Sequence, residues 1–223
     1  MTDAVRYPLV LGLISLCSAA GLALTYRLTR DEIRYQEQLK RDRGLAQVFG
    51  IQLEPKPGVA PPWRTVEPAT PPPEGQAACE VYEAKSPETG QPLYAAEGGA
   101  QGYSSRVEVV ISVTAGIRQG LDKAEIRDMK VVKQAETPGL GSKSADPAFQ
   151  EQFEHLPVPQ LQLQKNKPYR NPKSPEGAKE EITAITGATI TSNAVIDAVR
   201  QAVERIHQRL QEPPAREGPP AKP

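Results

Sequence analysis

The sequence predicts an α+β protein, in which a single N-terminal transmembrane helix precedes a domain with a central, mostly antiparallel sheet flanked by helices. Three features predict this class. Residues 8–24 contain no charged side chain, strand-like segments follow one another between residues 79 and 136, and one long amphipathic pattern lies near the C-terminus. Several strands with few, flanking helices indicate an α+β domain around one sheet.

The first element is a membrane anchor, expected over residues 1–27. Its charge-free run of seventeen residues is at the short end of what crosses a bilayer, about 17–25 residues. Tyr7 and Tyr26 lie where interfacial aromatic residues are usually found. Two alternatives compete. One is a cleaved signal peptide, because Gly21 and Ala23 satisfy a small-x-small cleavage rule. The other is a lipoprotein signal ending at Cys17, which the bulky Leu16 before it disfavours. We expect a retained anchor.

The next two segments are expected to connect the anchor to the folded domain. Residues 28–49 are predicted to form a stalk or docking helix, which begins at a capping box made by Thr29 and Glu32. Residues 50–76 are expected to form a semi-rigid spacer, because the stretch 55–75 contains eight prolines. Proline lacks the amide donor that helices and sheets need.

A folded domain is expected over residues 77–210. Alternating or continuous apolar runs predict strands at residues 79–84, 92–98, 106–113, 126–136 and 181–185. A short helix is expected at 148–155 and a basic, proline-broken loop at 163–180. Apolar residues at helical spacing predict a packed helix over 194–210. The tail, 211–223, contains five prolines and is expected to be disordered.

Composition excludes several classes of function. The 27 basic residues balance 27 acidic ones, so no basic surface indicates a nucleic-acid partner. The two cysteines, Cys17 and Cys79, lie far apart in different contexts, which excludes a disulfide scaffold. His155 and His207 have no Cys or His partner at ligand spacing, so no metal site is expected. The sequence also lacks a dinucleotide fingerprint and a Walker loop.

The most informative motif is TGATITSNAV at residues 186–195, where a short strand meets the C-terminal helix. A strand, a glycine turn and a helix N-terminus form a recurrent phosphate-binding arrangement, since free amides and the positive end of the helix dipole point at the anion. Gly187 allows a close backbone approach, and Ala188 keeps that approach uncrowded. The motif therefore predicts a place where an anion can bind.

The same motif holds four hydroxyl side chains, those of Thr186, Thr189, Thr191 and Ser192. Thr191 or Ser192 is expected to cap the helix, which leaves two hydroxyls as turn residues or as functional groups. A hydroxyl nucleophile needs an adjacent base, and His155 and Glu136 are the only candidates with a distinctive context. No G-x-S-x-G elbow or S-x-x-K motif is present, which disfavours a hydrolase.

Two stretches resemble the motifs of the FMN-binding domain family. Residues 184–199, AITGATITSNAVIDAV, resemble its covalent-FMN attachment motif, and residues 136–143, ETPGLGSK, resemble the motif that lines its flavin site. Residues 102–113 resemble the strand before the second motif, and the anchor followed by LTRDEI matches too. The resemblance covers most of residues 8–207.

The resemblance implies where FMN binds. Thr189 occupies the position at which the family attaches the FMN phosphate through a phosphoester bond. The ring is expected against the loop 136–141, where Gly139 and Gly141 let the backbone run close to it. The implied cofactor-binding residues are Thr186, Gly187, Ala188, Thr189, Thr191 and Ser192 near the phosphate, and Glu136, Thr137, Gly139, Leu140 and Gly141 near the ring.

Among members of this family, the sequence is most similar to the G subunits of Rnf-type ferredoxin:NAD oxidoreductases. The C subunits of sodium-translocating NADH:quinone reductases (NqrC) are the alternative. The resemblance implies an electron-relay subunit with covalent FMN and no catalytic residues of its own. Its implied partners are the other subunits of a membrane electron-transport complex, a flavin transferase that attaches FMN, and membrane lipid.

Two features are in tension with the resemblance. The family holds its flavin domain on the periplasmic side of the plasma membrane, whereas the positive-inside rule predicts the opposite, because only Arg6 precedes the span and six basic residues follow it closely. We expect the family's orientation. Thr183 stands where the attachment motif usually has Asp. An anchored module that binds FMN loosely or not at all is therefore the second hypothesis.

Overall fold

The computed structural model describes residues 3–52, 60–66, 80–161, 163–164 and 182–212, and it divides into two compact units, residues 1–40 and 41–223. Most of the predicted basic loop and of the predicted tail lies outside the described residues, as does Cys79. The two units are described separately below.

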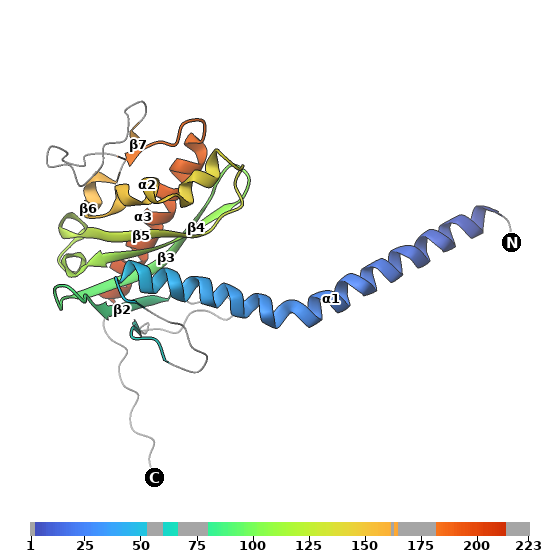
Figure 1. Cartoon of the computed structure of the whole chain (residues 1–223), viewed down its shortest axis with the longest axis horizontal. Coiled ribbons are helices and arrows are strands. Elements are labelled where there is room, and N and C mark those ends of the chain that lie inside the picture. The colour runs from blue at the N-terminus through green and yellow to red at the C-terminus, as the bar shows by residue number, and fades with distance from the viewer. Residues whose placement is uncertain (1–2, 53–59, 67–79, 162, 165–181, 213–223) are drawn as a thin grey trace, which may run out of the picture. The chain divides into compact units, whose positions relative to one another are not determined.

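The first unit is the N-terminal part of helix α1, Asp3–Val48 (Figure 1). By length and composition, the helix is able to cross a membrane over Leu9–Val48. It continues through Thr29, so the capping box predicted there is wrong. The Thr29 hydroxyl instead donates a hydrogen bond to the carbonyl of Thr25 (2.9 Å), as hydroxyl residues within helices commonly do. The predicted N-terminal apolar helix is confirmed.

The second unit is built on a six-stranded sheet in which the strands follow in chain order and every neighbouring pair is antiparallel. These strands are β1 (Arg64–Val66), β2 (Val81–Lys85), β3 (Pro92–Gln101), β4 (Arg106–Thr114), β5 (Glu125–Lys133) and β6 (Leu156–Pro157). Two further strands, β7 (Leu163–Gln164) and β8 (Ile182–Thr183), pair in parallel in a separate sheet. The predicted α+β class with a mostly antiparallel sheet is confirmed.

The sheet begins earlier than the predicted start of the domain at residue 77. Strand β1 lies within the stretch predicted to be a spacer and pairs with β2, with Arg64 opposite Glu83. The side chains of these two residues also form an ion pair (2.8 Å). The sequence gives little sign of β1 because only three residues between proline-rich stretches pair.

The helical elements of the second unit are short, apart from α3 (Thr189–Gln211). The helix predicted over 148–155 is divided into α2 (Pro147–Gln150) and a 3-10 turn, η4 (Glu151–Phe153). Further 3-10 turns are η1 (Ala115–Arg118), η2 (Leu121–Lys123), η3 (Gly141–Ala145) and η5 (Val158–Gln160).

Both faces of β4 are buried, which explains its nearly continuous apolar sequence. Val109 and Ile111 belong to the core cluster that includes the apolar face of α3, which crosses one face of the sheet (Figure 1). Val110 belongs to a second cluster, formed with Trp63, with Leu45, Ala46 and Val48 in the last turns of α1, and with Phe49 just after it. The last turns of α1 are therefore part of the folded domain.

Helix α3 approaches β3 so closely that only glycine fits at one position. A Cβ atom on Gly98 would lie 1.9 Å from the carbonyl oxygen of Ala198. Strand β3 extends beyond its pairing with β2, and within the described residues the side chains of α3 bond to its backbone there. Gln201 accepts a hydrogen bond from the Gly99 amide (2.9 Å), and Arg205 donates one to the Glu97 carbonyl (2.7 Å). These contacts hold α3 along the edge of β3 and protect it from pairing with another chain.

We predict that Gly98→Ala lowers the free energy of unfolding by about 1–3 kcal/mol, because the added methyl group overlaps backbone that cannot move aside locally. Gly99→Ala is the matched control, since its Cβ would meet only the flexible end of the Arg106 side chain. Urea unfolding followed by circular dichroism measures both. Equal losses in the two variants would contradict the proposed constraint.

Candidate functional site

The turn before α3 is shaped by the glycine of the TGAT motif. The amide of Ala188 donates a hydrogen bond to the carbonyl of Ile185 (2.9 Å), which closes a four-residue turn. Gly187 is the third residue of this turn and has a φ of 78°, a conformation that type II turns require and that glycine adopts at little cost. The chain thereby reverses from β8 into α3 within a few residues.

The two residues predicted to cap α3 have other roles, so that prediction is wrong. The Ser192 hydroxyl accepts a hydrogen bond from the Ile185 amide (3.0 Å) and donates one to the Ala188 carbonyl (3.0 Å), which braces the turn from inside. The Thr191 hydroxyl donates to Glu136 (2.7 Å). No side chain in the described part of the chain caps the start of α3. Its first amides are therefore available to an anion.

Thr189 is the first residue of α3, and its side chain is exposed. Among the residues that the structure describes, its hydroxyl has no hydrogen-bond partner. Thr186, in the preceding turn, is exposed as well. An exposed, unpaired hydroxyl beside uncapped helix amides is suited to carry or to bind a phosphate group.

The ETPGLG loop forms a second glycine turn beside the first. The Leu140 amide donates to the Thr137 carbonyl (3.2 Å), Pro138 and Gly139 occupy the centre of the turn, and Gly139 has a φ of 76°. A Cβ atom on Gly187 would lie 3.2 Å from the Cδ2 atom of Leu140. The two motifs, about fifty residues apart in the sequence, are therefore in contact.

Beneath this contact lies the buried carboxylate of Glu136, which is only 6% exposed. It accepts hydrogen bonds from the backbone amides of Tyr103 (3.1 Å), Ser104 (3.0 Å) and Ser105 (2.8 Å), and from the hydroxyls of Ser105 (3.1 Å) and Thr191 (2.7 Å). Burial by itself raises the pKa of Glu136, but the hydrogen bonds from Thr191, Ser105 and Ser104 outweigh it and lower the pKa below its ordinary value.

Gly141 packs against this carboxylate and not against open space. A Cβ atom on Gly141 would lie 2.7 Å from the Thr191 hydroxyl and 2.9 Å from an oxygen of Glu136. Gly139, in contrast, is exposed, and an added Cβ would meet nothing within 4 Å. Of the two glycines expected to admit a flavin ring, only Gly139 borders open space.

The structure thus divides the residues implied for FMN into two groups. The exposed group consists of Thr137, Gly139, Leu140, Thr186, Gly187 and Thr189. The buried group consists of Glu136, Gly141, Ala188, Thr191 and Ser192. The exposed residues are able to contact a ligand directly, whereas the buried ones hold the surrounding backbone in place.

Three residues of this region were missed in the sequence. Ser105 supplies two donors to Glu136. Tyr103 is 72% exposed and Ile190 is 56% exposed, next to the two motifs, where Leu140 is also 44% exposed. The pair of serines in GYSS was a usable signal, because short hydroxyl residues in a tight connection favour hydrogen bonds to nearby groups. Nothing in the sequence marked Tyr103 or Ile190 as exposed.

These residues fit a flavin mononucleotide. The uncapped amides and the exposed hydroxyl of Thr189 suit the phosphate, and the apolar side chains of Leu140 and Ile190 suit an aromatic ring. Within the described ranges, no group of three His, Cys, Asp or Glu residues is placed to hold a metal ion.

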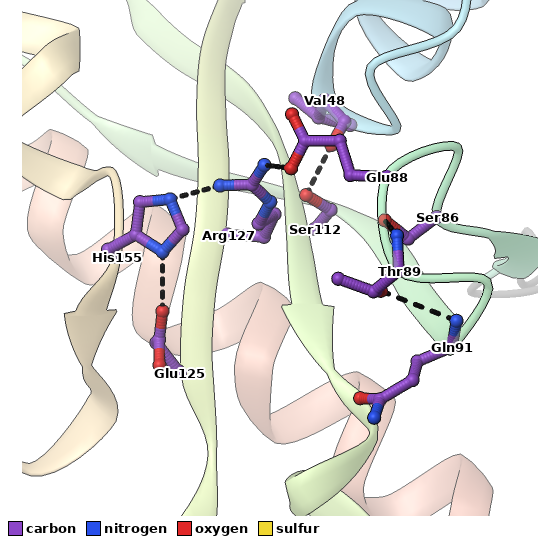
Figure 2. A network of polar contacts seen from close by, with 9 residues as sticks. All are labelled: Val48, Ser86, Glu88, Thr89, Gln91, Ser112, Glu125, Arg127 and His155. Atoms are coloured by element: carbon purple, nitrogen blue, oxygen red, sulfur yellow. Dashed lines mark hydrogen bonds and ion pairs between the residues drawn. The ribbon is translucent and has the colours of Figure 1, made fainter.

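The histidine considered as a possible base for a hydroxyl nucleophile lies elsewhere. Figure 2 shows the His155 ring between the carboxylate of Glu125 (2.7 Å) and the guanidinium of Arg127, which also pairs with Glu88. Glu125 and Arg127 lie at the start of β5, whereas Glu136 follows the end of this strand. A cavity of about 180 Å³ opens beside the network, and its lining includes none of the residues implied for FMN.

Glu136 does not act as the base either. Its carboxylate bonds to the Thr191 hydroxyl, and its other donors among the described residues come from residues 103–105, so the Thr189 hydroxyl has no adjacent base there. The geometry therefore gives no support to a hydrolase, since a hydroxyl nucleophile needs a base within hydrogen-bonding distance.

Two regions of the chain match the models of known protein families. Residues 102–204 match the model of the FMN-binding domain, and residues 1–48 match the model of the RnfG N-terminal region. The G subunit of the ion-translocating oxidoreductase complex of Methanosarcina acetivorans is 30% identical over 195 residues, which cover 86% of this chain and 89% of that protein.

Two further proteins are similar. The G subunit of the Na(+)-translocating ferredoxin:NAD(+) oxidoreductase complex of Acetobacterium woodii is 29% identical over 208 residues, which cover 91% of this chain and 90% of that protein. The crystal structure of NqrC from Shewanella oneidensis superimposes with a TM-score of 0.54 at 14% identity, covering 79% of this chain and 99% of that one. At this identity, the second likeness shows a shared fold alone.

We predict that Glu136→Gln lowers the free energy of unfolding at pH 7 by about 1–3 kcal/mol, because an amide leaves at least one buried donor without an acceptor. The folded-state pKa of Glu136 is lowered, so its ionised form stabilises the protein above the unfolded-state pKa. This contribution is lost as the pH falls through the folded-state pKa. Urea unfolding of both proteins from pH 7 to pH 3 is the measurement, and the difference should shrink towards the acid end. A difference that grows in acid would contradict the assignment.

Proposed function

Because this chain belongs to the family of G subunits of ion-translocating oxidoreductase complexes and carries an FMN-binding domain, we propose that it is an electron-relay subunit that holds FMN covalently through Thr189. The single observation that carries this proposal is the position of Thr189. Its exposed hydroxyl stands on the first residue of a long helix whose amides are uncapped. The free amides and the positive end of the helix dipole stabilise the negative charge of a phosphate attached there.

The bond proposed is a phosphoester between the Oγ1 atom of Thr189 and the phosphorus of FMN. Oγ1 replaces a substituent on that phosphorus and gives up its proton, and the displaced group leaves with the electron pair of the broken bond. We propose a flavin donor in which the FMN phosphate is joined to a second phosphate. The bond between the FMN phosphorus and the bridging oxygen breaks, and the second phosphate leaves with that oxygen and takes up the proton of the hydroxyl. A separate flavin transferase is the partner expected to bring this donor, since Thr189 has no adjacent base among the described residues.

The remaining exposed residues are proposed to hold the ring. Leu140 and Ile190 offer apolar contact, Thr137 offers a hydroxyl, and Gly139 leaves room because an added Cβ would meet nothing within 4 Å. FMN supplies the ability to accept and release electrons one or two at a time. The protein's part is to retain the group, to orient it against the ETPGLG loop and to leave one side open to an electron partner.

We propose that the complex is an Rnf-type ferredoxin:NAD oxidoreductase that couples electron transfer to ion translocation. The similarity to the Acetobacterium woodii protein over nine-tenths of both chains supports this choice. The alternative, a subunit like NqrC in a sodium-translocating NADH:quinone reductase, has the support of a shared fold. Other subunits of the complex and membrane lipid around α1 are the proposed partners.

Thr183 is the feature that favours the second hypothesis, an anchored module with loosely bound FMN or none. In the structure Thr183 lies in β8, and its backbone amide donates to the side chain of Gln152 (2.8 Å). This hydrogen bond does not depend on the side chain at residue 183. The strand is therefore able to enter the turn at Ile185 with Thr in place of Asp, which favours an intact attachment site.

We predict that the protein, produced with its flavin transferase, carries one FMN that persists in denaturant, and that Thr189→Ala carries none. Intact-mass spectrometry of the denatured proteins is the measurement. Thr186→Ala is the comparison that locates the bond, because it removes the other exposed hydroxyl of the turn and leaves the Oγ1 atom of Thr189 in place; covalent FMN is expected to persist in it, in full or reduced amount. Loss of FMN in Thr186→Ala alone would move the attachment to Thr186. An unmodified wild-type protein would favour the loosely binding module.

The domain that follows α1 is proposed to lie on the periplasmic side of the plasma membrane. The expectation is that a C-terminal alkaline phosphatase fusion is active in cells, because this reporter folds only outside the cytoplasm, and that a fluorescent-protein fusion exported by the same route is dark. The reverse pattern would support the orientation given by the count of basic residues after the span.

A further inference from the structure

We infer that Glu136 and Thr191 are positioning residues for flavin attachment: together they hold the first turn of α3 so that the Thr189 hydroxyl is presented in one orientation. Neither side chain is placed to touch the attached group, because both are buried. This inference rests on the proposed function, and it adds to it the means by which the attachment site is kept in shape.

The carboxylate of Glu136 joins three segments that are distant in the sequence. Its own loop leads into the ETPGLG turn, residues 103–105 connect β3 to β4, and Thr191 belongs to the first turn of α3. The Ser105 hydroxyl donates to Glu136 and also accepts a hydrogen bond from the Ala135 amide (2.8 Å). The carboxylate is thus tied to both neighbouring segments by several bonds.

Close packing leaves this arrangement little freedom. A Cβ atom on Gly102 would lie 2.6 Å from an oxygen of Glu136, and one on Gly141 would lie 2.7 Å from the Thr191 hydroxyl. Two glycines therefore bring backbone against the carboxylate from two sides. Because its surroundings are closely packed and both of its oxygens accept hydrogen bonds, the Glu136 side chain is held in one conformation.

The link from Thr191 to Thr189 is short. Thr191 lies two residues further along the same helical turn, so its bond to Glu136 fixes the rotation of that turn about the helix axis. Ser192 fixes the entering chain by bonding to both Ile185 and Ala188. Ser192 therefore fixes the chain that precedes Thr189, and Thr191 fixes the helical turn that follows it. The backbone of Thr189 is held from both directions.

The test compares the rate of flavin attachment with the stability of the fold. Full-length variants are produced with the flavin transferase under a separate inducer, and covalent flavin is followed over time by in-gel fluorescence after denaturation. Thr191→Val removes the hydroxyl with little change of shape. Thr191→Ser restores a hydroxyl. Ser112→Ala is the matched control, because Ser112 is also fully buried and donates to a backbone carbonyl, that of Val48, away from the motifs.

Thr191→Val is expected to attach flavin about tenfold more slowly than wild type, the factor that corresponds to loss of one hydrogen bond to a charged group. Thr191→Ser is expected to attach it near the wild-type rate. Ser112→Ala is expected to lower the melting temperature as Thr191→Val does but to leave the rate unchanged. A wild-type rate in Thr191→Val, or an equal slowing in Ser112→Ala, would overturn the inference.

A second readout separates this inference from the proposed function. Hydrogen exchange of the amides at residues 192–195, which are the first in α3 to donate hydrogen bonds within the helix, is measured in the unmodified proteins, without any flavin. Exchange is expected to be faster in Thr191→Val than in wild type and in Ser112→Ala, because the first turn of α3 is then held less firmly. Unchanged exchange would overturn the inference even if FMN is attached. Absence of FMN from the wild-type protein would overturn the proposed function instead.

Discussion

The contact between α3 and β3 at Gly98 determines where the candidate site forms. A Cβ atom there would overlap the Ala198 carbonyl, so helix and strand cross backbone to backbone at this point. Thr189 lies nine residues before Ala198, about 14 Å along the helix axis at 1.5 Å per residue. Gly102 lies four residues beyond Gly98, about 13 Å along the strand at 3.3 Å per residue. The start of α3 and the β3–β4 connection therefore lie at similar distances from the crossing, and the side chain of Glu136 is able to bond to both.

Glu136 fixes the start of α3 and the β3–β4 connection relative to each other. An ionised carboxylate is costly to bury unless hydrogen bonds replace the water it loses. Here the replacement donors come from residues 103–105 and from Thr191, so the carboxylate is stable only when these segments are in place together. The ETPGLG loop and the TGAT turn are consequently coupled, both through this carboxylate and through the apolar contact of Leu140 with Gly187.

The sequence predicts the elements whose pattern is local and long. The N-terminal apolar helix, α3 and the strands β2 to β5 follow from periodicity, with ends that shift by a few residues. Strand β1 does not, because three residues among prolines carry no period. The helix cap was mispredicted for a different reason: the Thr191 hydroxyl bonds to a carboxylate 55 residues away, which outcompetes the local cap that its position favours. Only the family resemblance predicts that the two motifs lie close together, since no pattern in the sequence specifies which loops are in contact.

The openness of the site gives a physical reason for a covalent bond. The side chains that border Thr189 and the ETPGLG turn are themselves substantially exposed, as Leu140, Ile190 and Tyr103 are, so a ring resting on them would bury only part of its surface. Apolar burial contributes about 25 cal/mol per Å², and a shallow site therefore binds a flavin weakly. A deep pocket would bind it more tightly but would place protein between the ring and an electron partner. On the proposed function, a phosphoester at Thr189 retains the group without enclosing it, and the open face remains accessible to the neighbouring subunit.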